Sequence, residues 1–167
     1  MNLYLLRHGA AVQRSAPGYL DDADRPLTDE GREKLRAVAR AMKAMKLNFD
    51  RILSSPCQRA RQTAEIIADR LDLASRIEFS DHLAPNGRID ALIQQMQGLR
   101  PKPENVLLVG HEPCLSELAS MLMTGKTGLP LKLKKAGLVR LSANRLRVGA
   151  CAELDWLLTP GLMKLMR

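Results

Sequence analysis

A short apolar run at the start of the chain, Leu3 to Leu6, sets the strongest limit on how this sequence folds. The run contains the β-favouring Tyr4, is too short for an independent helix, and is typical of a buried strand. It ends at Arg7, His8 and Gly9, so a cation and an imidazole follow where the strand leaves the sheet. Because ligands of open α/β sheets bind beyond the carboxyl ends of strands, Arg7 and His8 are either functional residues or a solvated strand end.

A second apolar run, Val106 to Val109, ends in a similar way. A continuous run of this kind predicts a central parallel strand that is covered on both faces. The run is followed by Gly110, His111, Glu112 and Pro113, and proline favours the first turn of a helix. Helix N-termini attract anions, so we expect His111 at an anion site.

Between these runs, residues 49–54 predict another strand, followed by a helix with Ser55 as N-cap and Pro56 at its first position. Arg59 and Arg61 lie in the opening turns of this helix, where cations oppose the helix dipole. A nearby anion would remove the conflict. Arg59 is therefore a candidate phosphate ligand, whereas Arg61 is interpreted as a surface residue.

The stretch from residue 10 to residue 26 is polar and irregular, and long ordered connections are often functional. Its three aspartates, Asp21, Asp22 and Asp24, are interpreted as parts of a solvated loop rather than as a metal site. Thr28 then predicts the N-cap of a helix, since apolar residues recur after it at helical spacing.

Beyond Thr124 the pattern changes to short strands, predicted over residues 129–133, 138–141, 146–148 and 154–158. The cations that alternate with apolar residues in this region are Lys132, Lys134, Arg145 and Arg147. Alternation with a period of two places side chains on one face of a strand. We expect these cations on one solvated face, which is either an ordinary soluble surface or a docking strip for an acidic partner.

Charge and composition restrict the partners of the 167-residue chain. Its formal net charge of +8 suggests anionic partners, but 3% aromatic residues and the absence of a nucleic-acid-binding motif argue against nucleic acid. It has no apolar stretch near the ~20 residues of a membrane helix and no secretory signal, so no membrane association is expected. Its three cysteines are far apart and fit reduced thiols, which favours a cytoplasmic location. Its length predicts one domain over residues 1–167.

If the strands are parallel, Arg7, His8, Arg59 and His111 converge on one edge of the sheet. Two guanidiniums can grip a phosphoryl group, while one imidazole attacks phosphorus and the other donates to an equatorial oxygen. Neighbouring cations lower the pKa of a histidine and keep a nucleophile neutral. No metal or other cofactor is expected, because the arginines supply the charge, and the spacing of His8, His82 and His111 matches no common zinc pattern.

These residues belong to a series of motifs that resembles the histidine phosphatase superfamily (the phosphoglycerate mutase-like fold) and, within it, the SixA-type phosphohistidine phosphatases. The matching pieces, in the order of the family, are Leu6-Arg7-His8-Gly9, Arg25-Pro26-Leu27-Thr28 with Gly31, Ser54-Ser55-Pro56 with Arg59-Ala60 and Gln62-Thr63, Leu83-Ala84-Pro85-Asn86-Gly87, and Val109-Gly110-His111-Glu112-Pro113. The resemblance implies a three-layer α/β/α sandwich with a central, mostly parallel sheet. It also implies that His8 is the phosphorylated nucleophile and that Arg7, Arg59 and His111 hold the phosphoryl group.

The chain departs from the family at the proton donor. Mutase-type relatives carry an acid after the position of Leu83, where this chain has Ala84 and Pro85. Acid-phosphatase relatives have an aspartate after the second histidine, where this chain has Glu112. Glu112 is therefore either a candidate acid in contact with substrate or a carboxylate at a helix start. Gly9 is the other substrate contact that we expect.

A missing strong acid fits a phosphoramidate substrate, since an imidazole leaving group can depart already protonated. The sequence thus predicts a phosphatase for phosphohistidine on a phosphotransfer domain or a phosphocarrier protein, acting as a monomer or weak dimer. One alternative is a phosphomonoesterase of the same superfamily, acting on a small nucleotide, sugar or terpenoid phosphate. The other is a non-catalytic protein of this fold that binds phosphate.

Overall fold

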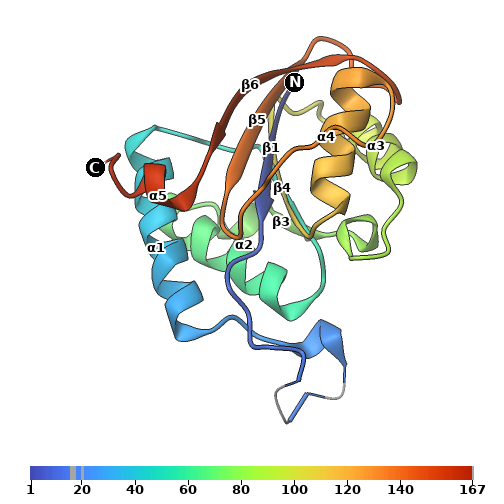
Figure 1. Ribbon diagram of the computed structural model, residues 1–167. Coiled ribbons are helices and arrows are strands. Elements are labelled where there is room, and N and C mark those ends of the chain that lie inside the picture. Colours follow the sequence, from blue (N-terminus) through green and yellow to red (C-terminus); the bar gives the residue numbers. More distant parts are fainter. Residues whose placement is uncertain (16–17, 20, 167) are drawn as a thin grey trace.

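The centre of the molecule is a six-stranded sheet with strand order β3-β2-β4-β1-β5-β6 (Figure 1). The computed structural model describes residues 1–15, 18–19 and 21–166, so part of the predicted irregular stretch lies outside the described residues. The strands are β1 (Asn2–Arg7), β2 (Arg51–Ser54), β3 (Ile77–Phe79), β4 (Asn105–Gly110), β5 (Leu138–Ala143) and β6 (Ala152–Leu158). The first four pair in parallel, while β5 and β6 are antiparallel additions, which confirms the predicted mostly parallel sheet.

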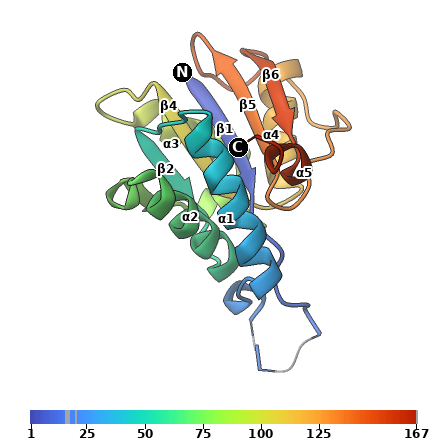
Figure 2. The same ribbon diagram turned by 90° about the vertical axis from the view of Figure 1, so that its left-hand side faces the viewer.

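Helices cover both faces of the sheet, as expected for a three-layer sandwich. One layer holds α1 (Asp29–Ala44), α2 (Gln58–Leu71) and α5 (Pro160–Met163), and the other holds α3 (Ile89–Gly98) and α4 (Cys114–Thr124). Figure 1 shows the sheet between these layers, and Figure 2 shows α1 and α2 side by side in front of it. Short 3₁₀ turns lie at η1 (Asp22–Asp24), η2 (Ala74–Arg76) and η3 (Asp81–Leu83).

Strand alternation explains how one sheet supports two cores. Tyr4 and Leu6 pack into the core that contains α1 and α2, whereas Leu3 and Leu5 pack into the core that contains α3 and α4. All four side chains are 5% exposed or less. The apolar run that opens the chain is therefore buried on both faces, as a central strand requires.

The start of α1 agrees with the sequence, but the start of α2 does not. The Thr28 hydroxyl accepts a hydrogen bond from the Gly31 amide at 3.0 Å, which confirms the predicted N-cap. The helix α2 begins at Gln58, so Ser55 is not its cap and Pro56 is not its first residue. Ser55 instead stays in register with the sheet, where its amide donates to the Val109 carbonyl at 2.9 Å.

Two of the four predicted C-terminal strands are also wrong, because residues 129–133 and 146–148 form irregular connections. The first segment cannot join the sheet beside β1, since β4 and β5 pair with both edges of that strand. The second lies in the connection between β5 and β6, where Leu146 is buried and its carbonyl accepts a bond from Gln97 Nε2 at 2.9 Å.

The four cations predicted to share one face fall into two separate pairs, because the segments that carry them are not strands of the sheet. Lys132 and Lys134 precede β5, beside the carboxyl end of β1, whereas Arg145 and Arg147 follow β5, beside the amino end of β1. All four cations are exposed, but they lie near opposite ends of a strand rather than on one face.

Among the described residues, no helix is long and apolar enough to cross a membrane.

Candidate active site

The two predicted histidines meet because their strands are parallel neighbours. Arg7 on β1 pairs with Gly110 on β4, and the His8 amide donates to the Gly110 carbonyl at 3.1 Å. The imidazole rings of His8 and His111 lie with their centroids 4.9 Å apart and their planes at 52°. Both side chains are buried, at 8% and 2% exposure. The convergence expected from the sequence is therefore present.

A hydrogen bond fixes the orientation of the His8 ring. Its Nδ1 lies 2.7 Å from the Gly9 carbonyl oxygen. Since a carbonyl oxygen can only accept, Nδ1 carries the proton, and Nε2 of the neutral ring keeps a free lone pair.

The surroundings of His8 favour the neutral form. Burial lowers its pKa from 6.5 to about 4, although the Gly9 hydrogen bond opposes this shift. The charges of Arg59, Arg7 and Lys135 contribute to the same lowering of the His8 pKa. A neutral imidazole with a free Nε2 is the form that can attack phosphorus.

The His111 ring contacts Ser55, which the sequence analysis predicted to be a helix N-cap. The Ser55 Oγ lies 2.9 Å from His111 Nε2 and accepts a bond from the Cys57 amide at 3.3 Å. Burial, followed by the charges of His8 and Arg59, lowers the pKa of His111 to about 3. The Ser-Ser-Pro motif was visible in the sequence, but the adjacency of β2 and β4 is what gives Ser55 this position.

Arg59 lies in the first turn of α2 and is 3% exposed. Its terminal nitrogens donate to Asp22, one to the backbone carbonyl at 2.6 Å and the other to Oδ2 at 2.9 Å. Arg61, two residues later, is exposed, pairs with Glu65 at 2.9 Å, and lies 5.7 Å from the centre of the Phe79 ring. The prediction that Arg61 is a surface residue is therefore confirmed, whereas Arg59 is buried.

Asp22 is a site residue that the sequence did not single out. Its carboxylate contacts three arginines: Arg25 at 2.6 Å, Arg59 at 2.9 Å and Arg14 at 2.9 Å. Burial raises its pKa, but the hydrogen bond from Arg25 and the charges of the three arginines outweigh that effect and hold the pKa below its ordinary value. Asp22 is partly exposed, as expected in a solvated loop, but its contact with Arg59 was not predicted, because no local pattern reveals a partner 37 residues away.

The remaining motif residues hold the exit of β1 against α1 and α2. Thr63 Oγ1 donates to the Arg59 carbonyl at 2.7 Å and accepts from the Gly9 amide at 3.1 Å. A Cβ at Gly31 would lie 2.2 Å from the Ala10 carbonyl oxygen, so only glycine lets these two segments approach so closely. The Gly9 amide, one of the expected substrate contacts, is thus already hydrogen-bonded to Thr63.

Three buried nitrogens of the site have no hydrogen-bond partner among the described residues: Arg7 Nε, Arg59 Nε and His111 Nδ1. Arg7 also donates from a terminal nitrogen to the Leu133 carbonyl at 2.9 Å. A buried donor without a partner costs about 1–3 kcal/mol, and an anion that accepts from several such donors recovers that cost. These nitrogens are therefore suited to an oxyanion.

The two remaining candidates, Glu112 and His82, make other contacts. The Glu112 carboxylate accepts a bond from the Ser116 amide at 3.2 Å, which favours its interpretation as a helix-start residue of α4. His82 belongs to η3, is half-buried, and its carbonyl lies 3.9 Å from the Cys114 sulfur. Within the described part of the chain, His, Cys, Asp and Glu side chains form no group of three or more that could hold a metal ion.

Comparisons with known proteins agree with this geometry. Residues 3–85 match the model of the histidine phosphatase superfamily (branch 1). The chain is 34% identical over 128 residues to the phosphohistidine phosphatase SixA of Escherichia coli K12, covering 76% of this chain and 77% of that protein. It is 40% identical over 151 residues to an uncharacterized protein of Picosynechococcus, covering 90% of each.

Among solved structures, the chain is similar to the protein histidine phosphatase SixA complexed with tungstate. The two share a TM-score of 0.82 and 28% sequence identity, over 96% of this chain and 98% of that chain.

Proposed function

Because this chain belongs to the histidine phosphatase superfamily and is a phosphatase, we propose that it removes phosphate from phosphohistidine carried on a protein. His8 is the nucleophile of this proposal, and Arg7, Arg59 and His111 hold the phosphoryl group. The observation that carries it is the pairing of a neutral, oriented imidazole with three buried N–H donors that have no partner among the described residues.

The first step transfers the phosphoryl group to the enzyme. His8 Nε2 forms a bond to phosphorus as the P–N bond of the substrate breaks. The substrate ring has already taken a proton from solvent on its other nitrogen, so it departs as neutral imidazole. Arg7 and Arg59 neutralise the charge on the equatorial oxygens, which is most of what phosphoryl transfer requires.

In this proposal, donation from the Ser55 hydroxyl sets the tautomer of His111. The Ser55 oxygen accepts from the Cys57 amide and has its own proton to donate to His111 Nε2. That donation leaves the ring proton on Nδ1, which is buried and has no partner among the described residues. His111 Nδ1 then donates to a phosphoryl oxygen as a neutral hydrogen-bond donor.

The second step is hydrolysis of phospho-His8. Water attacks phosphorus, the bond to His8 Nε2 breaks, and both protons of the water leave with inorganic phosphate. The imidazole regains its lone pair with the proton still on Nδ1, where the Gly9 carbonyl holds it. Splitting one displacement into two lowers each barrier, as in other covalent mechanisms.

The carboxylates of the site favour phosphohistidine over phosphate esters. The pKa of Asp22 is held low by arginines, and Glu112 accepts a bond from the Ser116 amide at the start of α4, so neither is arranged as a proton donor. An alkoxide leaving group needs such a donor, whereas a protonated imidazole does not. The similarity to SixA proteins, one of them complexed with the tetrahedral anion tungstate, supports the same choice.

A substrate panel tests this proposal. The purified protein is assayed against a phosphocarrier protein and a phosphotransfer domain, each phosphorylated on histidine, and against nucleotide, sugar and terpenoid phosphates. We expect kcat/KM for a phosphohistidine protein to exceed that for every ester by about 10²-fold or more, the scale of the general-acid contribution that esters would lack. A higher kcat/KM for any of the esters would instead assign the chain to small-molecule phosphomonoesterases.

A further inference from the structure

A strongly basic cavity of about 550 Å³ opens beside the active site, between the segment that precedes β5 and the start of α5. Its lining comprises the Thr159–Gly161 segment and five cations: Arg7, Lys34, Lys134, Lys135 and Lys164. No carboxylate is among the lining residues of the described chain. Lys34 pairs with Glu30 at 3.5 Å, but within the described residues Lys134, Lys135 and Lys164 have no such partner.

Two residues connect this cavity to the reacting centre. Arg7 lines the cavity and also precedes His8 in the strand-end motif. Lys135 lines it as well, and its charge contributes to the lowered pKa of His8. The Ala136 amide, next to Lys135, donates to the Arg7 carbonyl at 3.0 Å, so this basic segment is held against the site.

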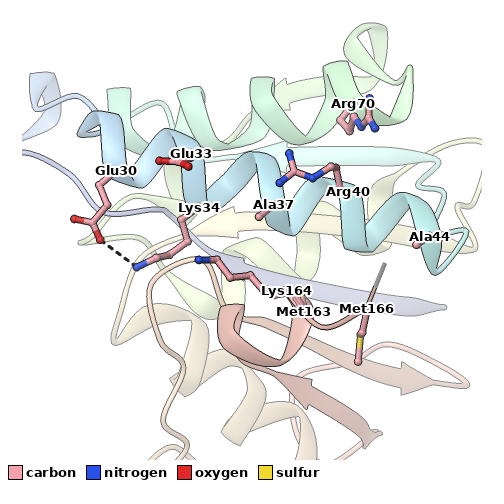
Figure 3. Close-up of a pocket in the computed structure, with 10 residues that line it drawn as sticks. All are labelled: Glu30, Glu33, Lys34, Ala37, Arg40, Ala44, Arg70, Met163, Lys164 and Met166. Carbon is pink, nitrogen blue, oxygen red and sulfur yellow. Dashed lines mark ion pairs between the residues drawn. The ribbon is translucent and has the colours of Figure 1, made fainter.

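The cavity continues into a groove along α1. Lys34 and Lys164 line both the cavity and this groove of about 680 Å³, which extends from Glu30 to Ala44 beside α5. Figure 3 shows the Lys34 and Lys164 side chains close together between α1 and α5. At a rise of 1.5 Å per residue, the segment from Glu30 to Ala44 is about 21 Å long.

The length of this surface decides between a small ester and a protein as its occupant. A small phosphate ester fills the catalytic mouth and one adjoining subsite, whereas about 21 Å is the length of some six extended residues. Ala37, Ala44 and Met163 place apolar surface among the charges of the groove. The cavity places cations near the histidines, and the groove farther away has both charged and apolar residues. This arrangement is complementary to a protein whose acidic side chains lie close to its phosphohistidine.

We propose that this cavity, with the adjoining groove along α1, is the docking site for acidic side chains of the protein that carries the phosphohistidine. The proposal rests on the proposed function, and it names the surface that selects a protein substrate. It replaces the basic strip expected from the sequence, because only the cations that precede β5 lie beside the active site.

The test is a charge reversal that spares the catalytic residues. In Lys134→Glu/Lys164→Glu, we expect kcat/KM for a histidine-phosphorylated phosphocarrier protein or phosphotransfer domain to fall by about tenfold or more. Hydrolysis of an aryl phosphate should stay within about twofold, since neither Lys134 nor Lys164 is among the groups that hold the phosphoryl group. The phosphoprotein rate of the variant should also depend less steeply on salt, because fewer ion pairs form on encounter.

The matched control is Lys102→Glu/Arg145→Glu, which makes the same charge change at two exposed positions. Lys102 precedes β4, and Arg145 follows β5 beside the amino end of β1. It should leave both substrates unaffected. An equal loss on both substrates in the Lys134 and Lys164 variant, or an equal loss in the control, would overturn docking while leaving the proposed function intact. Failure of the wild-type protein on every phosphohistidine protein would overturn both proposals.

Discussion

Cations lie at both ends of the β1 strand, but only those at its carboxyl end meet buried histidines. There, parallel pairing brings Arg7 and His8 from β1 to His111 from β4, and α2 adds Arg59. At the amino end, Arg145 lies in an exposed connection between antiparallel strands. Topology, rather than local charge, therefore assembles the candidate site. The parallel strands gather residues about 100 positions apart, while one antiparallel strand of about 20 Å separates Lys134 from Arg145.

Removing His8, the proposed nucleophile, should have the largest effect on the site at the carboxyl end of β1. We expect His8→Asn to lower kcat by about 10⁴-fold or more, because the covalent step is lost and the remaining donors only bind phosphate. The assay is phosphate release under single-turnover conditions, with thermal melting to show that the variant is folded. Activity within about tenfold of wild type would mean that another group attacks phosphorus.

The two arginines of α2 provide the next contrast. Arg59→Ala should lower kcat/KM by about 10²–10³-fold, the range for losing one donor to a transition-state oxyanion. Arg61→Ala should stay within about twofold, since an exposed i,i+4 ion pair contributes little. Equal losses in the two variants would show that Arg59 acts through the stability of α2 and not through the phosphoryl group.

Acid pH should lower the stability of the protein through buried His8, whereas the exposed cations keep their charge. The folded pKa of His8 is about 4, below its ordinary value of 6.5, so the unfolded chain takes up this proton first as pH falls. Stability is therefore complete above pH 6.5 and is lost as pH falls toward 4, by on the order of 3 kcal/mol for this residue. Urea unfolding from pH 7.5 to 4 measures the loss. His8→Asn should flatten the profile, and a slope unchanged from wild type would contradict the buried neutral state.

The smallest expected effect concerns Asp22, which we interpret as a positioning residue for Arg59. Asp22→Asn should lower kcat by roughly tenfold, as loss of a residue that orients another typically does, with little change in melting temperature. The control is Asp21→Asn, because Asp21 accepts a bond from the Ala23 amide that asparagine can keep. A loss in melting temperature without a loss in kcat would limit Asp22 to a structural role.

Much of the site could be predicted because its signals are local. The runs at Leu3–Leu6 and Val106–Val109 predict buried strands by hydrophobicity alone, and a histidine follows each of them. Thr28 caps α1 as expected from the residue types around it. Parallel strands have their carboxyl ends at one edge, so the meeting of His8 and His111 follows from these local signals and the sheet type.

The rest depends on neighbours that a sequence does not show. Ser55 contacts His111 because β2 lies beside β4, and Asp22 contacts Arg59 because η1 lies against α2. Residues 129–133 have the alternation of a strand, but both edges of β1 are already paired, so the segment instead supplies the Leu133 carbonyl to Arg7. The contacts of these residues depend on how distant segments pair in the fold, and not on local secondary-structure propensity.

A rapid-quench experiment shows most directly whether phosphate passes through His8. The protein is mixed with radiolabelled phosphohistidine protein, quenched in denaturing alkali, which preserves phosphohistidine, and the labelled peptide is mapped. We predict a transient, alkali-stable and acid-labile label on Nε2 of His8 that forms and decays at rates compatible with turnover. A label on any other residue, or turnover with no labelled enzyme at any time, would show that phosphate does not pass through His8.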